Sequence, residues 1–365
     1  MNGSSRSARV LLCAAVALTM MSLAAPCAMA GGSDYGDKDF SVRLPPAFVR
    51  FTEVSTLGGE TVANRYSSAS NPASAGWLSW PSKYGLIAAP YYSQINFDSG
   101  MRLHLYGQSV TWDSGQWGVF QPTLSQIRTD HTRDRQGMTF DYSVDTAQLQ
   151  WGKRYGNLGV GADFNFARAR IERNGVVTQN VMGQAVPARV DTDSTAESYR
   201  WRLGGLWQPA DKWLTGLIFE YGFQPFRSKS RVTIPMPEGM PAVTKTIQND
   251  GTQQQYILRP GVSYEYAKMS TIYVDYQYGN FISPRDHLIS HRFNAGVDHR
   301  VFDWLMARVG PSIDVRGNVG ISCGLSAFLS TWCSLNVGYQ YNMLPEIERE
   351  FGRAQTIQAA LAFRF

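Results

Sequence analysis

The residue types that could support nucleophilic catalysis come closest together at Ser290, His291 and Asn294. A serine nucleophile needs a histidine base within hydrogen-bonding reach, and an amide or carboxylate must orient that base. Ser290 and His291 are adjacent in a segment of alternating polarity, and neighbouring side chains of a β-strand point to opposite faces. His287 and His291 are both odd-numbered, so they point to the same face of the strand, away from Ser290. His287 therefore cannot serve as the base either. The sequence therefore predicts no catalytic set, and we expect that the protein is not an enzyme.

The composition narrows the fold class. The chain has 365 residues, of which 44% are hydrophobic and 13% aromatic. This aromatic content excludes a disordered chain, and 4 cysteines are too few for a disulfide-rich scaffold. The only long apolar run is N-terminal, which excludes a multi-span helical protein. The sequence holds no cluster with metal-ligand spacing and no phosphate-binding glycine loop, so no cofactor is implied. A β-rich domain remains, either soluble or embedded as a barrel.

The N-terminus has the features of a secretory leader. Arg6 and Arg9 precede an apolar stretch, and small residues follow at 28–30. We interpret residues 1–30 as a signal peptide cleaved after Ala30, with an N-terminal membrane anchor as the alternative. Without these two arginines the chain keeps 32 basic and 29 acidic residues. That balance gives no basis for a nucleic-acid partner.

Hydrophobic alternation runs through most of the remaining chain. In the last ten residues, 356–365, apolar side chains occupy the odd positions and polar or small ones the even positions. Similar segments recur upstream, and strands of outer-membrane barrels alternate in this way between lipid and lumen. We predict about fourteen strands. They are 83–97, 102–112, 115–128, 138–152, 156–173, 195–208, 212–228, 252–267, 269–281, 287–300, 303–316, 317–328, 331–342 and 354–365.

Loop lengths and tryptophans favour a barrel over a soluble sandwich. Predicted connections alternate between short turns and longer loops, as expected for periplasmic turns and outer loops. Indoles prefer the membrane interface, and seven tryptophans border the short turns. They are Trp112, Trp117, Trp151, Trp207, Trp213, Trp304 and Trp332. Residues 81–365 are therefore predicted to form an all-β, transmembrane antiparallel β-barrel in the lipid of a bacterial outer membrane. The terminal Phe365 resembles the signal read by the barrel-assembly machinery, which we expect as a partner.

The alternation of outward and inward positions along each strand also predicts which charged residues face the lumen. A strongly selective pore would carry rings of one sign, whereas here both signs are interspersed. We expect these charges to satisfy one another or to hold a plug, while Gly161, Gly204 and Gly216 leave room beside them. The predicted lumen charges are Asp163, Arg200, Arg202, Glu220, Arg259, Glu265, Asp275, Arg292, Asp298, Arg308 and Asp314.

Two cysteines remain after the predicted cleavage. Cys323 and Cys333 are both odd-numbered and lie symmetrically about a turn predicted near Phe328 to Thr331. They could form a structural disulfide across this hairpin. Two free buried thiols are the alternative.

Residues 31–80 precede the first predicted strand and have loop composition with several aromatic side chains. This length is too great for a simple lead-in to a barrel. We predict an N-terminal hatch, a plug segment inserted into the lumen, with a disordered periplasmic tail as the alternative.

A family resemblance supports the hatch. Leu57-Gly58-Gly59, followed by Asn71-Pro72-Ala73 just before the first strand, resembles the entry segment of outer-membrane long-chain fatty acid and aromatic hydrocarbon transporters. The resemblance implies a fourteen-stranded barrel with an N-terminal hatch that contains Asn-Pro-Ala. This chain has Ser74 where the family commonly has glycine. Independently, Asn71 and Pro72 favour a rigid turn that could anchor the hatch, or an ordinary turn leading into the barrel.

The resemblance also implies sideways release of apolar substrates through a break in the wall near the third strand. Pro122 lies within the predicted strand 115–128 and cannot donate a hydrogen bond to a neighbouring strand. We hypothesise that Pro122 marks such a lateral opening. The alternative is that Pro122 lies at a β-bulge or at a strand end, where proline is tolerated.

These observations predict a channel for passive uptake of small hydrophobic molecules, fatty-acid-like or aromatic. The alternatives are a water-filled porin and a structural or secretion-accessory barrel. An accessory barrel could bind another protein through the predicted outer loops 174–194 and 229–251.

Overall fold

The computed structural model describes most of the predicted barrel and part of the predicted hatch. The described residues are 61–65, 70–78, 85–130, 132–133, 137–181, 184–235, 242–283, 286–342 and 352–365. The predicted leader and residues 31–60 lie outside them. No helix in the described part of the chain is long and apolar enough to cross a membrane.

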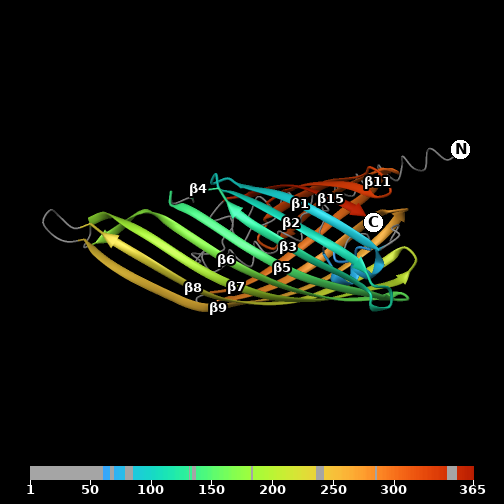
Figure 1. Ribbon diagram of the computed structural model, residues 1–365, viewed down its shortest axis with the longest axis horizontal. Helices are drawn as coiled ribbons and strands as arrows, with labels where there is room; N and C mark the ends of the chain where they lie inside the picture. Colours follow the sequence, from blue (N-terminus) through green and yellow to red (C-terminus); the bar gives the residue numbers. More distant parts are fainter. Residues whose placement is uncertain are drawn as a thin grey trace.

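One antiparallel sheet closes on itself to form the barrel (Figure 1). The first strands are β1 (Leu86–Phe97), β2 (Arg102–Asp113), β3 (Val119–Thr129), β4 (Thr132–Arg133), β5 (Thr139–Tyr155), β6 (Leu158–Val181) and β7 (Gln184–Ala210). The others are β8 (Trp213–Ile234), β9 (Val243–Ala267), β10 (Ser270–Ser283), β11 (Asp286–Phe302), β12 (Leu305–Asp314), β13 (Val319–Phe328), β14 (Cys333–Tyr341) and β15 (Ala354–Arg364). Pairing of β1 with β15 and of β3 with β5 completes a 14-strand wall, and β4 is a short addition beside β5. The predicted fold is confirmed.

Strands β6 to β9 project well past the rest of the barrel (Figure 1). They have 24, 27, 22 and 25 residues, and the β6–β7 ladder continues to the pair Val181 and Gln184. Most of the loops predicted at 174–194 and 229–251 are therefore strand. These parts of the sequence lack clear hydrophobic alternation, which was the basis for predicting strands. Apolar residues such as Val176, Val243 and Ile247 are exposed among polar ones there.

The outer surface carries the apolar band of a membrane protein. Leu203, Leu217 and Phe219 are exposed on neighbouring strands, and so are Leu149 and Leu258. A contiguous exposed apolar surface of this kind marks contact with lipid. Six of the seven predicted rim tryptophans are exposed near the short turns, at fractions of 46–68%. They are Trp112, Trp117, Trp207, Trp213, Trp304 and Trp332.

The predicted disulfide is wrong. Cys323 and Cys333 are both free thiols, the first exposed and the second buried. Phe328 pairs with Ser334, so the hairpin is centred on Thr331, at the end of the predicted turn and not midway between the two cysteines. This register places Cys323 opposite Tyr339, while Cys333 pairs with Phe363 on the other neighbouring strand. The two cysteines therefore do not meet across the hairpin.

Candidate functional site

A short 3-10 helix, η1 (Pro72–Trp77), forms the centre of the described hatch, which comprises residues 61–65 and 70–78. Asn71 is its N-cap, and the Asn71 side-chain oxygen accepts a hydrogen bond from the Ala73 amide at 3.0 Å. Pro72 at the first helical position has a φ suited to the turn and no N–H that would need a partner. The Asn-Pro-Ala motif therefore specifies this local structure.

Asn71 also ties the hatch to the barrel wall. Its side-chain amide donates to the carbonyl of Val62 at 2.9 Å and to the carbonyl of Gly205 on β7 at 3.1 Å. Asn71 is completely buried. One side chain thus caps η1, joins the two described parts of the hatch, and fastens both to β7.

A row of glycines on four neighbouring strands receives the hatch. We call Gly152 on β5, Gly161 on β6, Gly204 on β7 and Gly216 on β8 the glycine wall. Gly161 pairs directly with both Gly152 and Gly204. A β-carbon at Gly161 would lie 2.4 Å from the Ala73 amide nitrogen, and one at each other wall glycine would lie 2.1–2.4 Å from a hatch atom. These glycines therefore leave room for the hatch. The sequence predicts only that some of them leave room beside charged residues of the lumen.

Asp275 on β10 binds the start of the described hatch. Its carboxylate accepts hydrogen bonds from the Thr61 hydroxyl at 3.1 Å and from the Val62 amide at 3.0 Å. Arg259 on β9 lies 3.5 Å from the same carboxylate. Because these donors replace water around a buried charge, they offset its desolvation and fix the position of the hatch.

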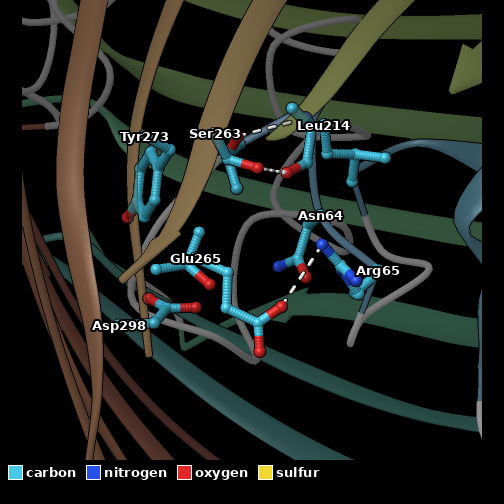
Figure 2. A pocket seen from close by; sticks show the side chains of 10 residues that line it. Asn64, Arg65, Leu214, Ser263, Glu265, Tyr273 and Asp298 are labelled. Carbon is cyan, nitrogen blue, oxygen red and sulfur yellow. Dashed lines mark hydrogen bonds and ion pairs between the residues drawn. The ribbon is translucent and has the colours of Figure 1, made fainter. Parts of the chain in front are cut away.

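Strand β9 makes two further bonds to the hatch beside a small polar cavity, shown in Figure 2. The Ser263 hydroxyl donates to the carbonyl of Ala63 at 2.7 Å. Arg65 reaches Glu265 at 3.3 Å, and both side chains are about four-fifths buried. The hatch is therefore bound along the inside of β5 to β10.

Replacing Asn71 with alanine should loosen the hatch without unfolding the barrel. The variant loses the cap and two hydrogen bonds to carbonyls, together worth about 3 kcal/mol. Trypsin cleavage after Arg65 should then accelerate by at least about tenfold. Ser74→Ala is the matched control, because the buried Ser74 hydroxyl has no hydrogen-bond partner among the described residues. Equal cleavage rates for both variants would contradict the anchoring role of Asn71.

The predicted lumen charges lie inside the barrel, in part as buried pairs. Arg202 lies 2.8 Å from Asp163, and Arg308 lies 3.7 Å from Asp298. Glu220 accepts a hydrogen bond from Gln255 at 2.7 Å. Arg200, Arg292 and Asp314 are buried as well, and Glu265 is partly buried. Oppositely charged neighbours thus partner one another, so these residues form no ring of one sign.

A cluster of buried apolar side chains inside the barrel was not predicted. It lies at the end opposite the hatch, on inward positions of β15, β1, β2, β3, β5 and β6 and of the adjoining parts of β7 and β8. We call this packed cluster the apolar chamber. Its members are Ile95, Phe97, Met101, Leu103, Leu105, Ile127, Phe140, Tyr142, Val144, Ala167, Ala169, Ile171, Ala196, Phe226 and Ala354, and Tyr91 packs against them.

The sequence contains a signal for the chamber. Inward-facing Leu103 and Leu105 alternate with outward-facing Arg102 and His104, so the apolar face of this end of β2 is the inner one. A rule that assigns apolar residues to lipid and polar residues to the lumen assigns such a segment to the wrong face. The opposite wall follows the rule, because Gln253 and Asn294 are buried at inward positions of β9 and β11. The lumen is therefore apolar on one side and polar on the other.

Pro122 lies on β3, and the pairing around it differs between the two neighbouring strands, β2 and β5. On the β5 side, Gln121, Pro122 and Thr123 have consecutive partners. On the β2 side, pairing stops after Ser109 with Thr123 and resumes at Trp112 with Phe120. We call the unpaired stretch, Val110 and Thr111 beside Gln121 and Pro122, the β2–β3 gap.

The residues considered for nucleophilic catalysis lie on opposite faces of β11. Ser290 is buried and faces inward, whereas His291 faces outward and lies 2.6 Å from the Tyr276 hydroxyl on β10. They cannot act on one substrate. No group of three or more metal-ligating side chains occurs within the described ranges.

Comparisons with solved structures identify the same fold in outer-membrane channels. The CymD monoaromatic hydrocarbon channel matches with a TM-score of 0.59 and 12% identity, covering 86% of this chain and 99% of that chain. The toluene transporter TbuX of Ralstonia pickettii matches with 0.56 and 12%, covering 85% and 97%. A Pseudomonas aeruginosa FadL homologue matches with 0.53 and 11%, covering 85% and 96%. No protein-family model and no curated protein sequence matches this chain. At the level of fold, the predicted resemblance is confirmed, and the barrel is of the bacterial outer-membrane type.

Proposed function

We propose that this barrel is a channel for the passive uptake of small hydrophobic molecules across the outer membrane. The apolar chamber is the observation that carries this proposal. Porin-type barrels have polar interiors, because water must fill them. Here Leu103, Leu105 and Phe140 are fully buried at inward positions, so a ligand entering from the outer end would contact apolar side chains once it displaced the groups packed against them.

The substrate class is fatty-acid-like or aromatic. Two of the channels with this fold are a monoaromatic hydrocarbon channel and a toluene transporter, which supports an apolar substrate for this chain. A ligand of that kind gains free energy by leaving water for the chamber. Because this step needs no chemistry, the proposal includes no cofactor and no energy source.

The hatch makes the channel selective. Bound along β5 to β10, it occupies lumen space through which water and ions would otherwise pass. We propose that it blocks hydrophilic solutes while hydrophobic molecules partition into the chamber. A water-filled porin would instead need a lumen clear of such a segment.

Substrate uptake by whole cells tests the proposal. A Gram-negative host that lacks its own hydrophobic-compound channels would express the full chain and receive radiolabelled oleate or toluene. We expect a several-fold higher initial uptake rate than in the empty host for at least one of the two compounds, with sucrose entry unchanged. Increased sucrose entry with unchanged uptake of both hydrophobic compounds would instead indicate a porin.

We further propose that the β2–β3 gap is a lateral opening, with Pro122 at its edge. Proline removes one donor from this part of the wall, which supports weaker pairing to β2. A disulfide between cysteines at Thr111 and Gln121 should close the gap and reduce oleate uptake by at least about fivefold, with recovery after reduction.

The matched control places the same bond where β2 and β3 are already paired. Cysteines at Ser109 and Thr123 replace residues that face each other in the ladder. We expect this bond to leave uptake unchanged. Equal loss of uptake in both variants would show that the crosslink acts without closing an opening at the gap.

A further inference from the structure

The outward face of β8 changes abruptly from apolar to basic. From Trp213 to Pro225, its outward positions carry no charged side chain. The next three outward positions are Arg227, Lys229 and Arg231, all exposed. We call these three residues the basic ladder.

The basic ladder begins at the outer edge of the membrane. A strand tilted by about 45° and rising about 3.3 Å per residue gains roughly 28 Å over the 12 steps from Trp213 to Pro225. The apolar band of an outer-membrane barrel is about 25 Å tall. Phe223, just below the ladder, stacks with Tyr199 on β7 at 5.0 Å between ring centroids, as in an aromatic girdle. Arg227 therefore lies at the level of the outer lipid headgroups.

The positive charges of the basic ladder are not engaged in ion pairs within the described residues. Within the described residues, none of the three forms an ion pair or a side-chain hydrogen bond to a carboxylate. The carboxylates opposite Lys229 and Arg231 on β7 are Asp193 and Asp191. Asp193 is paired with Arg170 at 3.5 Å, and Asp191 is paired with Arg189 at 3.3 Å. None of the neighbouring carboxylates that the structure describes pairs with the ladder: Arg170 is shared by Asp193 and Glu172. Asp250, opposite Arg227 on β9, accepts a hydrogen bond from Gln248 at 3.0 Å.

Outward-facing basic side chains occur on β2, β3 and β5 to β8. Besides the ladder they are Arg102, Arg128, Lys153, Arg168, Arg170 and Arg189. Outward positions of β10 and of β12 to β15 carry no lysine or arginine in the described part of those strands. A general attraction to anionic lipid would not require this asymmetry. It favours a localised site where a headgroup with more than one phosphate can contact neighbouring cations.

We propose that the basic ladder binds the phosphate groups of a phosphorylated glycolipid, lipid A, in the outer leaflet. Lysine and arginine form charge-assisted hydrogen bonds with phosphate oxygens. The acyl chains would lie along the apolar positions below, including Phe219 and Tyr221. This inference goes beyond the transport function. It depends only on the outer-membrane fold and on the long ends of β6 to β9 lying on the outer side of the membrane.

Native mass spectrometry of the full chain in detergent, titrated with bisphosphorylated lipid A, tests the proposal. Arg227→Gln/Lys229→Gln should weaken lipid A binding by about tenfold or more. Lys212→Gln/Lys268→Gln removes the same charge from the exposed turns at the other end of the barrel. This control should stay within about twofold of the unmodified chain.

Dephosphorylated lipid A provides a second measurement that needs no variant. Its binding to the unmodified chain should fall to the level of the ladder variant. Equal binding of the two lipids, or equal binding by the ladder variant and the control, would overturn the proposal. Heat-dependent gel migration verifies that each variant is folded.

Discussion

Replacing Gly161 with valine should turn a closed barrel into one that conducts ions. The new β-carbon would lie 2.4 Å from the Ala73 nitrogen and from the Pro72 carbonyl carbon, which are backbone atoms of the hatch. Overpacking a close interface costs about 1–3 kcal/mol, and contact with backbone leaves little room for relief. The population with the hatch unseated should therefore rise by about tenfold to a hundredfold. Mean conductance in planar bilayers should increase by a similar factor.

Gly205→Val is the matched control, because Gly205 is the next residue along β7 after the wall glycine Gly204 and faces outward. A β-carbon at Gly205 meets no atom within 4 Å. The Gly205 carbonyl that binds Asn71 is unaffected by a side chain. We expect the control to conduct as little as the unmodified chain. Low conductance from Gly161→Val as well would mean that the glycine wall does not determine how the hatch is seated.

Replacing Leu105 with glutamate should abolish most hydrophobic uptake. Leu105 is fully buried in the apolar chamber. An ionised carboxylate there would retain water, because transfer of an isolated charge into apolar surroundings is very costly. A hydrophobic ligand would then lose apolar contact and would have to displace bound water. We expect initial oleate uptake to fall by at least about tenfold, or about 1.4 kcal/mol in free energy.

Gln253→Glu tests whether the loss depends on the position of the charge. Gln253 faces inward on β9, outside the chamber and away from the β2–β3 gap. The variant adds the same charge to the lumen, and uptake should stay within about twofold of the unmodified chain. Leu105→Met conserves an apolar side chain and should also leave uptake nearly unchanged. Equal losses with glutamate at both positions would indicate a nonspecific effect of charge.

The barrel could be predicted from sequence because each membrane-crossing strand faces two different solvents. The last strand shows this clearly: Ile357 and Leu361 face lipid, and Thr356 and Gln358 are buried inside, as their positions predict. The parity argument also placed Arg202 and Asp163 on the inside, where they form a pair. Short turns and tryptophans then oriented the sheet.

Other features depend on contacts that no local pattern records. The cysteine prediction failed because a small error in the centre of a turn changes every pairing along a hairpin. The length of β6 to β9 was missed because strands outside the membrane lose the alternation that reveals them. The chamber was missed because Leu103 and Leu105 are apolar on the inner face, against the usual rule. The glycine wall required the hatch and four strands to be seen together.

Single-channel recording of the full chain and of a variant lacking residues 31–80 tests the central claim most directly. We expect the full chain to show no steady ion conductance, because the hatch occupies the lumen. The deletion variant should show long-lived openings, since the remaining lumen is lined on one side by polar residues that admit water. A large, steady conductance from the full chain, unchanged by the deletion, would contradict the account and make the protein a porin.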